Sequence, residues 1–101
     1  GRALLPADYL RQATTPRHPG GAPVFAPYGY LWWLSAERLA RGQTRGAIMA
    51  NGYGGQWLYV DPARDAVIAV TARRTPESAA RGQALALIRR DILPALPRPA
   101  Q

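Results

Sequence analysis

A glycine-rich segment between two apolar runs carries the residue types best suited to ligand contact in this sequence. Gly52, Gly54 and Gly55 lie within four residues of one another. Gly54 and Gly55 can supply the positive φ angles that a two-residue hairpin loop requires, so a plain turn accounts for both of them. Gly52 precedes that turn, and glycine inside a strand often marks a place where a ligand approaches the backbone closely. The pattern therefore indicates a strand end that faces a ligand, with a hairpin turn alone as the alternative interpretation.

Phosphate binding does not fit the segment 52–55. A P-loop ends in Gly-Lys-Ser/Thr, and this chain contains no Lys. A dinucleotide-binding fingerprint opens a helix, whereas an apolar strand-like run follows here. The glycines therefore do not predict a nucleotide site.

A self-contained nucleophilic site has few candidate residues. The serines are Ser35 and Ser78, the one histidine is His18, and there is no Cys. Neither serine lies in a nucleophile-elbow motif. A Ser/His/Asp site is assembled in space, so sequence spacing alone does not exclude one.

Metal and cofactor sites are not predicted. The six acidic residues are spread along the chain without the spacing of metal ligands. We therefore expect neither a bound metal nor a cofactor.

The net charge of the chain indicates a second possible class of function. Its 101 residues include 13 basic side chains, all Arg, against six acidic ones, and the net charge is +7. These arginines are scattered rather than clustered, which is not the usual footprint of a nucleic-acid interface. The aromatic run 28–33 would fill a sheet or, alternatively, stack on bases. A small basic module for anionic partners such as nucleic acid is therefore the alternative hypothesis, with affinity that falls steeply with salt.

The composition bears on membrane insertion and on the cellular compartment. No apolar run approaches the roughly 20 residues that span a bilayer, so no membrane span is predicted. Without Cys, the redox compartment cannot be inferred.

The residue pattern predicts one α+β unit. We expect a helix, an antiparallel meander of about four strands, and a long C-terminal helix packed on one face of the sheet. The expected helices are 6–14 and 75–93, and the expected strands are 28–34, 46–53, 56–61 and 66–72. The residues between 14 and 27 read as a loop, and 35–45 as a loop or one helical turn.

Local signals fix several of these boundaries. Asp61-Pro62 suits a type I turn before the last strand. That strand, 66–72, is apolar on both faces, which predicts cover on both sides. Thr75-Pro76 is a helix start, and Pro94 is the expected end. The apolar stripe of this helix is formed by Ala84, Leu85, Ile88 and Ile92.

Several segments together resemble a known family. They are Tyr28-Gly-Tyr-Leu-Trp-Trp, Gly52-Tyr-Gly-Gly-Gln-Trp-Leu-Tyr-Val-Asp-Pro and Asp65-Ala-Val-Ile-Ala-Val-Thr, preceded by the helix-like Leu4–Pro16. Their order and spacing resemble the C-terminal third of the β-lactamase-related serine hydrolases, in the branch of class C-like esterases and 6-aminohexanoate-oligomer hydrolases. The resemblance covers nearly the whole chain.

The resemblance implies a partial β-lactamase/transpeptidase-like fold and an incomplete active site. The family uses a Ser-x-x-Lys helix, a Tyr-centred motif and a Lys-Thr-Gly-like strand. The first motif is impossible here because there is no Lys. The resemblance thus implies that 1–101 is a single segment, the C-terminal part of a larger hydrolase domain, inactive alone. Its partners would be the N-terminal remainder and a small ester or amide; a periplasmic, secreted or cytoplasmic location is compatible.

The third motif would fall on the glycine-rich segment. Placing it at Ala50, Asn51 and Gly52 makes these residues, with Gly54, the substrate-binding strand, and makes the backbone N–H of Tyr53 one oxyanion-hole donor. The rival register uses 53–55 and the N–H of Gln56. We prefer the first register because it leaves Gly54-Gly55 for the turn.

Position 50 departs from the family pattern. The family often carries a cation there to grip a substrate carboxylate, and this chain has Ala50. The departure favours an ester or amide without that anion, unless Arg45 substitutes for the missing cation.

The resemblance also predicts self-association. In the family, the strand that corresponds to 66–72 is central and bordered by an N-terminal strand. We therefore expect the free edge of 66–72 to pair with another copy of this chain or to leave an exposed patch.

Overall fold

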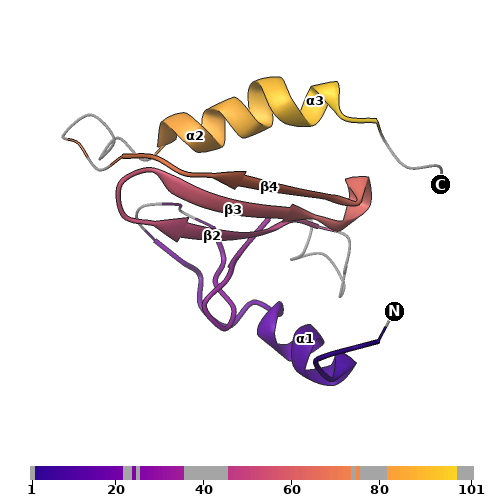
Figure 1. Cartoon of the computed structure of the whole chain (residues 1–101). Coiled ribbons are helices and arrows are strands. Elements are labelled where there is room, and N and C mark those ends of the chain that lie inside the picture. The colour runs from indigo at the N-terminus through magenta and orange to yellow at the C-terminus, as the bar shows by residue number, and fades with distance from the viewer. Residues whose placement is uncertain are drawn as a thin grey trace.

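A four-stranded antiparallel meander forms the centre of the molecule (Figure 1). The computed structural model describes residues 2–21, 24, 26–35, 46–73, 75 and 82–97. The helices and strands are α1 (Ala7–Ala13), β1 (Trp33–Leu34), β2 (Ile48–Gly52), β3 (Gln56–Asp61), the 3₁₀ turn η2 (Pro62–Arg64), β4 (Ala66–Val70), α2 (Gly82–Leu87), the π-helical η4 (Ile88–Ile92) and α3 (Leu93–Ala95). Neighbouring strands pair in the order β1-β2-β3-β4. The predicted α+β class and meander are confirmed.

One face of the sheet packs on the C-terminal helical segment. Met49 of β2 and the two aromatic side chains of β3, Trp57 and Tyr59, are buried there. They pack against Leu85 and Ile88 of the helix, and the Ile88 side chain is 0% exposed. This confirms the predicted apolar stripe, because Ala84 and Ile92 also contact this cluster.

The end of the helical segment differs from the prediction. Helix continues through Pro94 to Ala95, and Leu96 is extended. A proline inside a helix removes one backbone donor and clashes with a preceding carbonyl. Here Pro94 lies in the first turn of α3, directly after the π-helical residues 88–92, where the regular ladder is already interrupted. Residues 76–81, which hold most of the predicted helix start, lie outside the described residues.

The aromatic run does not form the long strand predicted over 28–34. Only Trp33–Leu34 is strand, because the chain doubles back before it. Leu31 has a φ of 64°, and the N–H of Gly29 donates to the carbonyl of Trp32 at 2.8 Å. Tyr28 therefore lies opposite Trp33, with the two rings 4.7 Å apart.

The helix α1 forms close to its predicted bounds but is barely buried. Of its residues only Ala13 is buried, while Tyr9 and Leu10 are about half exposed. In Figure 1, α1 lies below the strands and the C-terminal helix lies above them. The N-terminal helix is thus not part of the main core.

The turn between β3 and β4 is the predicted Asp-Pro turn, lengthened to one 3₁₀ turn. The Asp61 carboxylate accepts from the N–H groups of Ala63 and Arg64 at 3.0 and 3.3 Å. The Arg64 guanidinium donates to the same carboxylate at 2.7 Å, and Asp61 is 3% exposed. A buried carboxylate with these donors is satisfied, so the turn is anchored.

The strand β4 is not covered on both sides, so that prediction is wrong for the described part of the chain. Ile68 and Val70 pack against the core, whereas Val67 is 67% exposed and Ala69 is exposed. Successive strand residues point to opposite faces. The helix covers only one face, so the alternate residues of β4 stay in solvent.

Candidate functional site

The strand β2 extends beyond its neighbour β1. The two strands pair only at Leu34 with Ile48 and at Trp33 with Met49. No strand of the described part pairs on that side with Ala50–Gly52, which we call the open end of β2. An unpaired strand edge presents backbone N–H and C=O groups to a ligand. The open end is therefore the natural place for a ligand to contact the sheet.

A three-residue turn follows the open end. β2 ends at Gly52, which pairs with Gln56, so the turn consists of Tyr53, Gly54 and Gly55. This corrects the expected two-residue loop and the expected extension of the strand to 53. The φ angles of Gly54 and Gly55 are 97° and 87°, which side-chain-bearing residues rarely adopt.

The predicted substrate-binding residues come together at one end of this hairpin. Ala50 and Asn51 are half-buried, Gly52 and Tyr53 are exposed, and Gly54 is buried. The side-chain amide of Asn51 donates to the carbonyl of Gln56 at 3.2 Å, which closes the hairpin across the two strands.

Both candidate registers place the oxyanion donor at this end of the hairpin. Tyr53 is the first turn residue, and Gln56 is the first residue of β3. Arg45, the candidate cation, lies outside the described residues.

The fold itself leaves room at Gly52. A Cβ built there would meet the Gln56 Cβ at 3.4 Å as its nearest contact, an ordinary van der Waals distance. The φ of Gly52 is not in the left-handed region. Because neither backbone conformation nor packing within this chain demands glycine, the free space is available to a ligand.

This contrast predicts opposite effects for two glycine substitutions. We expect Gly52→Ala to leave the free energy of unfolding unchanged or to raise it by up to about 1 kcal/mol, because alanine loses less entropy on folding. Gly55→Ala should lower it by about 1–2 kcal/mol, the cost of a left-handed backbone with a Cβ. Urea denaturation followed by circular dichroism measures both changes. Equal losses for the two variants would show that Gly52 serves the fold rather than a ligand.

The serine and histidine candidates are not joined in the described structure. Ser35 follows β1, where its N–H donates to the carbonyl of Ala47 at 2.9 Å, and its buried hydroxyl has no hydrogen-bond partner in the described part. His18 accepts at Nδ1 from the N–H of Gly20 at 2.9 Å. Ser78 lies outside the described residues. Neither described residue is therefore arranged as a nucleophile with its base.

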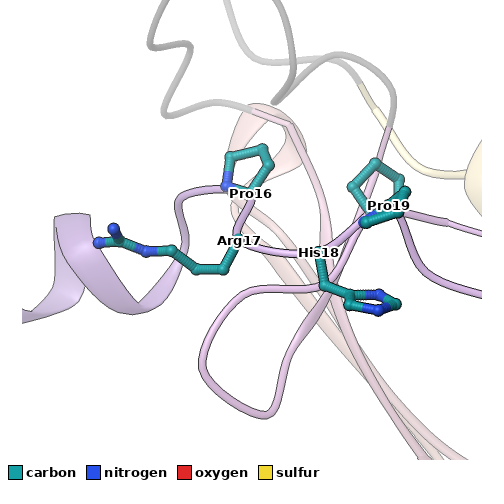
Figure 2. A pocket seen from close by; sticks show the side chains of 5 residues that line it. Pro16, Arg17, His18 and Pro19 are labelled. Atoms are coloured by element: carbon teal, nitrogen blue, oxygen red, sulfur yellow. The ribbon is translucent and has the colours of Figure 1, made fainter.

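A shallow pocket of about 460 Å³ lies beside His18 in the N-terminal loop (Figure 2). Prolines 16, 19 and 27 line it together with Arg17 and His18. Figure 2 shows the Arg17 and His18 side chains pointing away from each other. The Arg17 guanidinium lies over the Tyr30 ring at 5.0 Å. Ligand sites need a few convergent polar groups, and these two do not converge.

Several arginines of the described structure are engaged locally. Arg11 pairs with Asp8, Arg64 with Asp61, and Arg90 with Asp91. These pairs reduce the positive charge available to an anionic partner. The described residues contain no group of three or more His, Asp or Glu side chains that would hold a metal ion.

The described helices are also too short or too polar to cross a bilayer.

The chain was compared with known protein families, curated proteins and solved structures. We found no family model, no curated protein and no solved structure that matches this chain.

Proposed function

We propose that this chain is the C-terminal portion of a serine hydrolase of the β-lactamase-related type. In this proposal the open end of β2 faces the substrate, and the backbone N–H of Tyr53 is one oxyanion-hole donor. The observation that carries the proposal is that β2 runs past β1 and ends at Gly52, where a ligand has room. The order of the segments that resemble the family supports it independently.

The chemistry assigned to the chain is stabilisation of charge. In acyl transfer a hydroxyl attacks a carbonyl carbon, and negative charge develops on the carbonyl oxygen. A preorganised N–H aimed at that oxygen lowers the energy of the transition state. The attacking hydroxyl and its Lys partner come from another polypeptide segment, because this chain has no Lys. The chain therefore supplies half of the pocket and is inactive by itself.

The residues at the open end suggest the substrate class. Ala50 and Gly52 are two residues apart in β2, so both lie on the face of the sheet that points away from the helix. Neither residue carries a charge. Asn51 holds the hairpin closed through its bond to Gln56. An uncharged strand of this kind suits an ester or amide that has no carboxylate at this position.

Activity measurements on the chain alone and joined to its partner test the proposal. We expect the pure 101-residue chain to give no burst with p-nitrophenyl acetate and no labelling by a fluorophosphonate. The coding sequence upstream of Gly1 should contain a Ser-x-x-Lys motif, and the polypeptide that carries both parts should show a stoichiometric burst. A burst from the chain alone, or an upstream sequence without that motif, would overturn the proposal.

A further inference from the structure

The outer edge of β4 is unprotected. β4 pairs with β3 on one side, and no strand of the described structure pairs with it on the other. Natural edge strands are usually blocked by Lys, Pro, a bulge or an inward-pointing charge. β4 is Ala-Val-Ile-Ala-Val and has none of these residues. Its edge is therefore suited to pairing with another strand.

Two opposite charges flank this edge. Asp65 directly precedes β4 and Arg73 follows it by three residues, and both are exposed. The nearby Asp61 and Arg64 pair with each other, whereas Asp65 and Arg73 have no ion pair within the described residues. A negative charge thus precedes the strand and a positive charge follows it. Two antiparallel copies of the strand would bring these opposite charges together.

We propose that β4 pairs antiparallel with β4 of a second copy of this chain, about a two-fold axis at Ala69. In this register residue numbers in opposed pairs sum to 138. Asp65, the left-handed turn residue directly before β4, then lies next to Arg73 of the second copy, and this contact occurs twice. Ile68 lies opposite Val70 of the second copy. Because this sum is even, the two residues of each opposed pair point to the same face of the joined sheet. The two sheets become one continuous sheet through an isologous contact.

The charges select this register over its neighbours. Centring the pair on Ile68 would place Asp65 opposite Thr71 of the second copy, and centring it on Val70 would place Asp65 opposite Thr75. Both shifts lose the two ion pairs. The chosen register also sets the exposed Val67 against Thr71 of the second copy, a β-branched pair of the kind that stabilises antiparallel sheets.

Single-cysteine variants test the register, because the chain contains no Cys of its own. Directly opposed residues have Cβ atoms roughly 4.5–5.5 Å apart, close to disulfide reach. We expect Ala69→Cys to form a covalent dimer under mild oxidation on a non-reducing gel. Val67→Cys alone should not form this dimer, because position 67 of the second copy lies about 13 Å away along the strand pair. A mixture of Val67→Cys and Thr71→Cys should cross-link.

Charge variants provide an independent measurement that needs no oxidation. We expect Asp65→Arg and Arg73→Asp each to raise the dimer dissociation constant by about 3- to 30-fold in analytical ultracentrifugation, since two exposed pairs are lost. The double variant should restore it. Circular dichroism of each variant checks that the chain is folded.

Two outcomes would overturn the self-pairing. One is cross-linking of Val67→Cys alone as efficiently as Ala69→Cys. The other is a monomeric chain at high concentration with no Ala69→Cys dimer, as expected if a strand of a different polypeptide occupies this edge. These measurements use the 101-residue chain alone and involve no catalysis, so their outcome is separate from that of the hydrolase proposal. In the joined polypeptide of that proposal, the family resemblance places an N-terminal strand at this edge, and the self-pairing is then expected to be absent.

Discussion

Replacing Tyr53 by proline should lower kcat by about 100- to 1000-fold in a polypeptide that joins this chain to its nucleophile-bearing remainder. Proline has no N–H, so the substitution removes the proposed oxyanion donor itself. Tyr53 is not among the residues with positive φ, and it opens the loop before Gly54, where a turn often accepts proline. The donor acts on the transition state, so KM should change much less than kcat. Steady-state hydrolysis of p-nitrophenyl esters measures both constants.

Tyr53→Ala is the matched control. It keeps the backbone N–H and removes only the side chain, which is 54% exposed. We expect its kcat to stay within a few-fold of the parent, with both variants checked for folding by circular dichroism. Equal losses in the two variants would show that the Tyr53 side chain, rather than its N–H, matters. A fully active Tyr53→Pro would instead favour the rival register, in which the donor is Gln56.

Truncating Ile88 to alanine should cost about 2–5 kcal/mol of folding free energy. Ile88 is 0% exposed and joins the helical segment to Met49, Trp57 and Tyr59 of the sheet. A small domain has only about 5–15 kcal/mol of stability in total, so a large fraction of the molecules should unfold under mild denaturation. Urea titration followed by tryptophan fluorescence measures the loss, because Trp57 lies in the same cluster.

The neighbouring Leu87 provides the control for that loss. It belongs to the same helical segment but is 43% exposed, so Leu87→Ala should cost about 1 kcal/mol or less. If Ile88→Ala destabilises the chain no more than Leu87→Ala does, the helix does not pack on the sheet through the stripe described above.

Local residue chemistry predicted much of the fold. The turn at Asp61-Pro62 was recognisable because Asp caps a turn and Pro presets φ, and the structure has both features. The helical stripe of Leu85 and Ile88 was recognisable because its spacing matches one helix face. In each case the decisive interaction lies within a few residues along the chain.

The failures involve residues whose environment is set from a distance. The aromatic run reads as a strand by propensity, yet Leu31 adopts a left-handed φ and Tyr28 folds back on Trp33. β4 is apolar on both faces, yet Val67 is exposed because only one face has a helix above it. Strand propensity measures how well a residue suits a half-buried surface, and it does not say which surface is present.

For the candidate site, composition alone showed that no Ser-x-x-Lys nucleophile can belong to this chain, since Lys is absent. The sequence also located the hairpin, because glycine is the residue that tolerates positive φ. Only the tertiary structure decided that β1 pairs with β2 no further than Met49, while β2 continues to Gly52. Strand pairing is a contact between distant segments, and its extent depends on how the intervening chain turns, which no local pattern records.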